Sequence, residues 1–120
     1  MKAALALLCC LLASCAALPS RAATGLLGEW RYADKIQSCR YVFKRDGSFS
    51  GDVIHRKKLV SKFTGRWSVD GHDLLYTYTS DALDKIPAGA TDRDKLLSVH
   101  EEFFVIEAAD GSRRKYLRVH

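Results

Sequence analysis

Three Asp-Gly pairs constrain the fold of this chain more than any other feature of its sequence. They stand at Asp46-Gly47, Asp70-Gly71 and Asp110-Gly111, each between two runs rich in β-branched and aromatic residues. Asp-Gly favours two-residue hairpins, because both central positions of a type I′ turn need a positive φ. One pair would be weak evidence, but three in such surroundings predict a series of antiparallel strands joined by tight turns.

The runs between these turns alternate apolar and polar residues, which is typical of strands with one buried face. The alternation places the following side chains on inner faces: Gly28, Trp30, Tyr32, Cys39, Tyr41, Phe43, Phe49, Val53, Phe63, Gly65, Trp67, Val69, Leu74, Tyr76 and Tyr78. About eight strands fit into the roughly 95 residues concerned. We therefore predict an all-β fold, a small antiparallel up-and-down β-barrel whose closure removes exposed strand edges. Residues 80–94 are the exception and are expected to form a loop or a short helical turn at one end.

The N-terminal segment has the pattern of a bacterial export signal. Met1-Lys2 precedes an apolar run of 10 residues, AALALLCCLL, which is too short to span a membrane. We assign residues 1–22 to a signal peptide with its lipobox and linker, and residues 25–120 to the barrel domain. The residues between 16 and 25 are expected to be a short connector.

Two processing routes remain open for this signal. Leu12-Ala13-Ser14-Cys15 resembles a bacterial lipobox, which predicts that Cys15 is lipidated and becomes the new N-terminus. The alternative is ordinary signal-peptidase cleavage after Ala17 or Ala22. Because Ala16 rather than aspartate follows the cysteine, the lipoprotein route predicts anchoring on the periplasmic side of the outer membrane. The other route predicts a soluble periplasmic or secreted protein.

The cysteines predict no intramolecular disulfide. Cys9 and Cys10 leave with the signal and Cys15 is lipidated or lies next to a cleavage point, so only Cys39 remains in the folded part. Cys39 shares a strand face with Tyr41 and is expected to be a small buried apolar residue. The alternative is a reactive thiol or an intermolecular bridge.

No group of residues predicts catalysis or metal binding, so we expect no enzyme, no cofactor and no metal site. The four histidines are scattered, and the acidic residues between 80 and 94 lack the spacing of an EF-hand. A G-x-S-x-G nucleophile motif is also missing.

The formal net charge of +5 comes partly from two basic clusters, Arg56-Lys57-Lys58 and Arg113-Arg114-Lys115. Nucleic acid is not an expected partner of an exported protein. The clusters are interpreted as a solvated basic rim, with anionic lipid headgroups or polysaccharide as the alternative partners.

Gly28-x-Trp30 on the first strand, followed by a meander with Asp-Gly hairpins, resembles the small lipocalin-like domains of bacterial exported proteins. The resemblance covers about residues 25–119 and implies the barrel architecture. It also suggests a binding module, tethered to the membrane through its lipid anchor, for a small apolar ligand or lipid. The inner-face aromatic residues predicted to bind this ligand are Trp30, Tyr41, Trp67, Tyr76 and Tyr78. Tyr76 and Tyr78 would line a mouth near residues 80–94.

Two alternatives to this binding site stay open. The same aromatic side chains could simply fill the barrel, which suits a short eight-stranded domain that needs its own core. The protein could instead be an envelope protein-interaction module, such as an inhibitor of a hydrolase.

Overall fold

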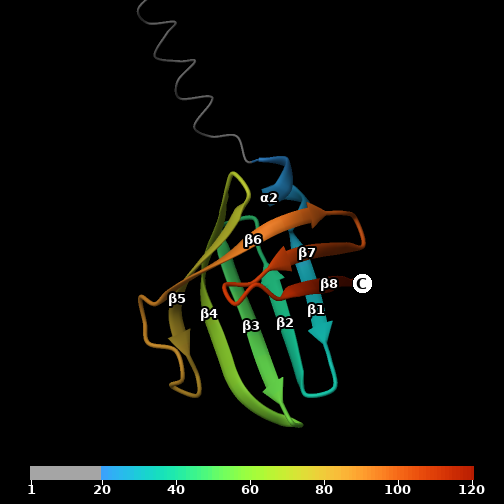
Figure 1. The fold of residues 1–120 in the computed structure, drawn as a ribbon. Helices are drawn as coiled ribbons and strands as arrows, with labels where there is room; N and C mark the ends of the chain where they lie inside the picture. Colours follow the sequence, from blue (N-terminus) through green and yellow to red (C-terminus); the bar gives the residue numbers. More distant parts are fainter. Residues whose placement is uncertain (1–19) are drawn as a thin grey trace, which may run out of the picture.

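Eight antiparallel strands follow one another around a closed barrel, and the last strand pairs with the first (Figure 1). The computed structural model describes residues 20–120. The strands are β1 (Gly28–Ala33), β2 (Gln37–Phe43), β3 (Ser48–His55), β4 (Lys58–Asp70), β5 (Asp73–Asp81), β6 (Thr91–Val99), β7 (Phe103–Glu107) and β8 (Arg113–Val119). The predicted all-β class, strand number and up-and-down order are thus confirmed. In the described part of the chain, every helix is too short or too polar to cross a membrane.

A short helix, α2 (Arg21–Gly25), precedes the barrel and covers one of its ends. The Ser20 hydroxyl accepts a hydrogen bond from Ala23 N at 3.0 Å, which caps the first turn of the helix. The chain then turns inward at Leu26, whose side chain is completely buried. The second half of the predicted connector is therefore part of the folded domain. The lipobox, Cys15 and the rest of the signal lie outside the described residues.

The three Asp-Gly pairs do form the predicted hairpins, but the predicted type I′ geometry is wrong at each of them. Only the glycine has a positive φ, which is 89° at Gly47, 61° at Gly71 and 85° at Gly111. In two of these hairpins the Asp side chain explains the difference, because it accepts hydrogen bonds from a serine two residues later. Asp46 Oδ1 binds the amide and hydroxyl of Ser48 at 2.9 and 2.6 Å, and Asp110 binds Ser112 in the same way. These local bonds leave the positive φ to the glycine alone.

The β3–β4 hairpin has the type I′ pattern at a dipeptide that gives no such sequence signal. Arg56 and Lys57 have φ values of 50° and 68°. Residues other than glycine, asparagine and aspartate are strained in this region, because their Cβ crowds the neighbouring carbonyl oxygen. A two-residue connection between twisted strands requires this conformation whichever residues occupy it.

The predicted 80–94 loop is shorter in the structure, because β5 continues to Asp81 and β6 begins at Thr91. The carboxylate of Asp81 holds this shorter loop in place. Asp81 is buried, with 7% of its surface exposed. It accepts hydrogen bonds from the Ser61 hydroxyl at 2.7 Å and from the amides of Lys62, Leu83 and Ile86 at 3.0–3.1 Å. Burial alone would raise the pKa of Asp81, but these bonds outweigh it and lower the pKa to about 2.

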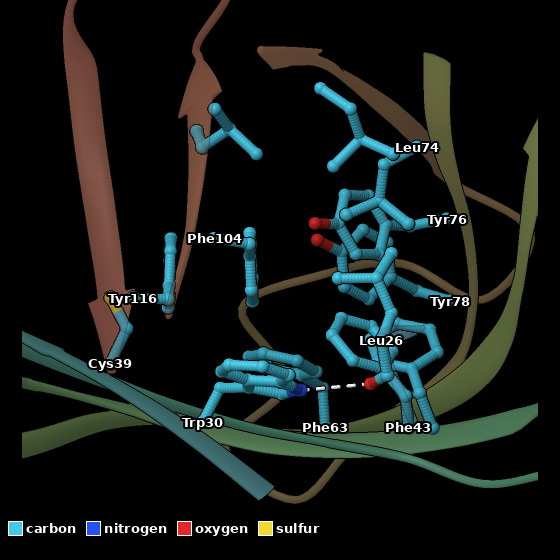
Figure 2. Packing of buried hydrophobic residues seen from close by; sticks show 13 residues of the cluster. Leu26, Trp30, Cys39, Phe43, Phe63, Leu74, Tyr76, Tyr78, Phe104 and Tyr116 are labelled. Carbon is cyan, nitrogen blue, oxygen red and sulfur yellow. Dashed lines mark hydrogen bonds between the residues drawn. The ribbon is translucent and has the colours of Figure 1, made fainter. Parts of the chain in front are cut away.

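Aromatic side chains fill the centre of the barrel, as Figure 2 shows for the buried residues. The Tyr41 ring lies 5.4–6.5 Å from those of five other residues, namely Phe43, Phe49, Phe63, Tyr76 and Tyr116. Two inward positions are glycine because there is no room for more. A Cβ on Gly51 would lie 2.8 Å from the Phe63 ring, and one on Gly65 would lie 2.6 Å from Phe49 and 2.2 Å from Thr77 O.

The two tryptophans differ in burial, which corrects the expectation that both are buried. Trp30 is fully buried, and its indole nitrogen donates to Leu26 O at 2.8 Å. Trp67 is only half-buried. It lies on an inner face, but next to the β2–β3 turn, where its indole nitrogen donates to Lys44 O at 2.9 Å. Its position at the end of the barrel leaves part of the ring in contact with solvent.

Candidate functional site

The two ends of the barrel differ in chemistry. At the end covered by α2, the interior is closed by Leu26, Trp30 and other apolar side chains. At the opposite end, which we call the far mouth, inward-facing side chains carry polar groups. They include Tyr32, Cys39, Tyr78, Asp94, Arg114 and Tyr116. They lie near the ends of odd-numbered strands and near the beginnings of even-numbered strands. The up-and-down strand order brings these positions together at one end of the barrel.

The phenol groups at the far mouth and in the adjoining interior stay neutral at physiological pH. Burial is the main cause of the raised pKa values of Tyr41, Tyr76, Tyr78 and Tyr116. The Tyr76 and Tyr78 hydroxyls point into the interior towards Phe104 and Tyr116 (Figure 2). Within residues 20–120, the Tyr78 hydroxyl makes no protein hydrogen bond shorter than 3.5 Å, so it is free to donate to a ligand.

Asp94 is a half-buried carboxylate on the β6 side of the far mouth. It accepts a hydrogen bond from the Tyr76 hydroxyl at 3.1 Å. Burial is the main cause of its raised pKa, and the nearby charge of Asp92 adds to the increase. The carboxylate therefore takes up a proton more readily than an exposed aspartate as the pH falls.

Arg114 faces the same mouth from β8 and is half-buried. Its guanidinium lies 5.6 Å from the centre of the Tyr32 ring. Across residues 20–120, no carboxylate oxygen comes within 4.0 Å of it, whereas Arg40 and Arg93 are both paired. A half-buried guanidinium without a paired anion retains donors for an anionic group from outside.

A hollow of about 660 Å³ opens beside the far mouth, where β6 runs past the end of β7. The first β6–β7 pair is Lys95 with Glu107, so the first residues of β6 have no partner on that side. Tyr76, Asp92 and the β7–β8 turn at Ala108 are among its lining residues. Leu75, Thr77 and Arg93 also line it, so the hollow lies on the flank of the mouth formed by β5 and β6.

All five predicted ligand-binding residues lie on the inner face of the barrel, at different depths. Trp30 lies beside Leu26 at the α2 end, and Trp67 is the direct partner of Tyr76 across β4 and β5. Tyr41 contacts Tyr76 and Tyr116, and Tyr78 lies one inward position further along β5 towards the far mouth. Asp94 and Arg114 also belong to this site, although neither was predicted as a site residue. The signal for Arg114 was its alternation with Tyr116 on the last strand, which places both side chains on the inner face.

The fold of this barrel is similar to those of solved bacterial structures. A lipocalin-like protein from Bacteroides uniformis superposes with a TM-score of 0.59 at 20% identity, over 79% of this chain and 99% of that one. An uncharacterized protein from Bacteroides eggerthii superposes with a TM-score of 0.57 at 12% identity, over 78% and 99%. The fold is lipocalin-like. No protein-family model matches the sequence, and no curated protein is significantly similar to it.

The far mouth of this lipocalin-like barrel combines aromatic surface, neutral hydroxyl donors and one unpaired guanidinium. Such a set can hold the anionic end of a small amphipathic molecule while its apolar part lies against rings. In the described region, no three His, Cys, Asp or Glu side chains gather as they would around a metal ion.

Proposed function

We propose that this protein is an exported, non-enzymatic binding module that takes a small amphipathic ligand with an anionic end at its far mouth. The observation that carries the proposal is the half-buried guanidinium of Arg114, which has no carboxylate partner within 4.0 Å among the described residues and lies in a mouth rich in tyrosine. The lipocalin-like barrel supports it as a scaffold suited to small ligands. The centre of the barrel is filled, so the ligand is expected to bind in the mouth and the adjoining hollow rather than deep inside.

Export with lipid anchoring at Cys15 is part of this proposal. Cleavage after Ala22 would remove Ser20, which caps α2, and Ala22, which packs against the core. Processing before Cys15 leaves the helix whole, as does cleavage after Ala17. The position of α2 therefore favours cleavage before Cys15 or after Ala17 over cleavage after Ala22. Of the first two, the lipobox pattern favours cleavage before Cys15.

Calorimetric titration with decanoate and decanol tests the ligand chemistry. Residues 20–120 contain α2 and all strands of the closed barrel, so this segment is the folded unit to use. Decanoate should bind at one site at least tenfold more tightly than decanol, because a charge-assisted hydrogen bond contributes about 1.5–3 kcal/mol. Arg114→Gln should remove that difference.

The matched control is Arg113→Gln, an exposed cation next to Arg114 on the same strand. It should keep the preference for decanoate. Equal binding of both compounds by the native protein would refute the anionic end of the proposal. If neither compound binds, the far mouth is not a site for such ligands and the envelope interaction module becomes the better hypothesis.

A further inference from the structure

Three large apolar side chains lie exposed together on two neighbouring turns at the far end of the barrel. Ile36, Ile54 and Leu59 are 49%, 37% and 43% exposed. Ile54 pairs directly with Leu59 across β3 and β4. The Ile36 carbonyl accepts a hydrogen bond from Arg56 N at 2.7 Å, which joins the β1–β2 turn to the β3–β4 turn. Ile36 and Ile54 also line a shared hollow of about 350 Å³.

Four cations surround these apolar side chains. Lys35, Arg56, Lys57 and Lys58 are exposed, and none has a carboxylate oxygen within 4.0 Å in the described part of the chain. We call the four cations together with Ile36, Ile54 and Leu59 the basic apolar tip.

A carboxylate that lines the same hollow is already engaged within its own turn. Asp34 accepts hydrogen bonds from the Tyr32 hydroxyl at 2.7 Å and from the amides of Ile36 and Gln37 at 2.8 Å. Its pKa is lowered, first of all by the bond from Tyr32, so it stays ionised and offsets one of the four positive charges. The tip therefore keeps a net positive charge.

Backbone strain at the tip is a second, independent observation. Arg56 and Lys57 occupy positive φ at a turn where Asn-Gly would be unstrained. Strained positions of this kind occur more often at functional sites than elsewhere, because fold stability alone would not favour them. The two cations are thus held at the outermost point of the hairpin against the local backbone preference.

We propose that the basic apolar tip docks on the surface of an anionic lipid bilayer. Cations next to exposed aliphatic side chains suit such a surface, because the charges meet lipid phosphates while the apolar groups enter the headgroup region. Two hairpin turns at the end of a barrel can be pressed into that region without unfolding any strand (Figure 1). This surface lies at the end of the barrel opposite α2, so the bilayer it would dock on is a different one from the bilayer that a lipid at Cys15 would enter. The inference depends neither on that anchor nor on what the far mouth binds.

Vesicle flotation with residues 20–120 tests this inference, using phosphatidylglycerol-containing vesicles and pure phosphatidylcholine vesicles. The informative variant is Arg56→Asn with Lys57→Gly, which removes two charges and also relieves the strained turn. Partition to anionic vesicles should fall roughly 30-fold, at about 1 kcal/mol for each cation. The thermal midpoint should rise at the same time, so lost binding cannot be attributed to unfolding.

A charge-matched control comes from the opposite end of the barrel, where Lys44 and Arg45 are also exposed. Lys44→Gln with Arg45→Gln should leave partition within about threefold of native. Ile54→Thr with Leu59→Thr should weaken partition, since it removes the apolar part of the tip. Equal losses in the two charge variants, equal binding to phosphatidylcholine, or no effect of the threonine variant would each overturn the proposal. Equally tight binding to soluble polyphosphate would also overturn it and indicate a soluble polyanion as the partner.

Discussion

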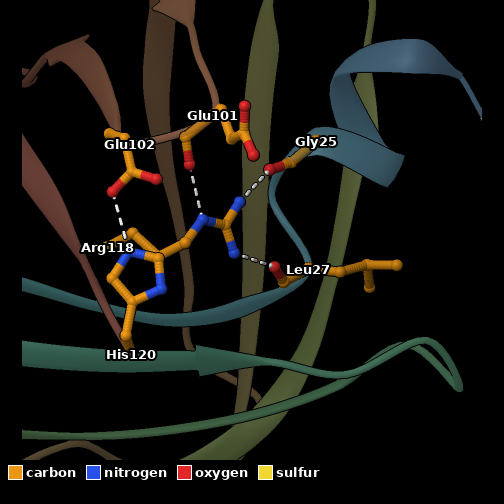
Figure 3. Close-up of polar contacts among 6 residues, drawn as sticks. All are labelled: Gly25, Leu27, Glu101, Glu102, Arg118 and His120. Carbon is orange, nitrogen blue, oxygen red and sulfur yellow. Dashed lines mark hydrogen bonds and ion pairs between the residues drawn. The ribbon is translucent and has the colours of Figure 1, made fainter.

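The guanidinium of Arg118 lies 4.1 Å from the centre of the Trp30 ring, which fastens the last strand to the first. The two residues are direct partners across β1 and β8, a seam of three residue pairs. Arg118 also donates hydrogen bonds to the carbonyl oxygens of Gly25, Leu27 and Glu101 (Figure 3). One side chain thus joins the end of α2, the residues that follow it, the β6–β7 turn and the barrel seam.

Loss of this contact should destabilise the whole barrel. Arg118→Lys keeps the charge but lacks the planar fork that reaches three carbonyl groups, so it should cost about 1–3 kcal/mol of unfolding free energy. Trp30→Ala should cost about 3–5 kcal/mol, the range for a large aromatic side chain in a core. Urea unfolding followed by circular dichroism measures both effects. Arg113→Lys on the exposed side of β8 is the control and should change stability by less than about 0.5 kcal/mol.

The Asp81 carboxylate should make the stability of the fold depend on acid pH. Its pKa is lowered from 3.8 to about 2, so its contribution is complete above pH 4 and is lost as the pH falls from about 4 to 2. Asp81→Asn should cost about 1–3 kcal/mol at pH 7, because buried donors lose acceptors. It should also flatten the pH dependence between 4 and 2. Thermal unfolding across that range measures both, with the exposed Asp84→Asn as a control that keeps the native slope.

Gly65 should tolerate no side chain. A Cβ there would lie 2.2 Å from Thr77 O, which is backbone and cannot move without disturbing the β4–β5 ladder. Gly65→Ala is therefore expected to destabilise the protein by about 1–3 kcal/mol, the usual cost of overpacking. Ser68→Ala, an exposed position on the same strand, should be nearly neutral in the same urea titration. Equal stability of the two variants would contradict the close approach of β4 and β5.

The sequence could predict what depends on local pattern. The Asp-Gly pairs marked three hairpins, and alternation correctly placed Trp30, Tyr76 and Tyr78 on inner faces. The type I′ turn at Arg56 could not be predicted, because strand pairing imposes it on residues that disfavour it.

Features that depend on closure were also beyond sequence reasoning. Arg118 meets Trp30, and Arg114 meets Tyr32, only once β8 has paired in register with its neighbours. The same holds for Asp94, since a carboxylate in an acidic loop and one on the inner face of a strand look alike in sequence. Its hydrogen bond to Tyr76 follows from the β5–β6 register.

Replacement of Cys15 tests the proposed lipid anchor. Cys15→Ala should move the protein from the membrane fraction to the soluble fraction of its own cells, because the thiol that would carry the lipid is gone. Cys39→Ala is the matched control: Cys39 is buried in the barrel, so its loss should leave fractionation unchanged. Identical fractionation of native protein and Cys15→Ala would show that the lipobox interpretation is wrong.

Two tyrosine-to-phenylalanine variants should separate binding from stability at the far mouth. Tyr76 donates to Asp94, so Tyr76→Phe leaves that half-buried carboxylate without its phenol partner and should cost about 1 kcal/mol of stability. Tyr78 has no such protein partner among the described residues, so Tyr78→Phe should leave the unfolding midpoint nearly unchanged. If the Tyr78 hydroxyl binds the polar end of the ligand, the same variant should weaken decanoate binding about three- to tenfold, the effect of one neutral hydrogen bond. Calorimetric titration and urea unfolding of both variants measure this contrast. Unchanged decanoate affinity in Tyr78→Phe would place the ligand's polar end elsewhere in the mouth, whereas a loss of stability in that variant would show that the hydroxyl serves the fold instead.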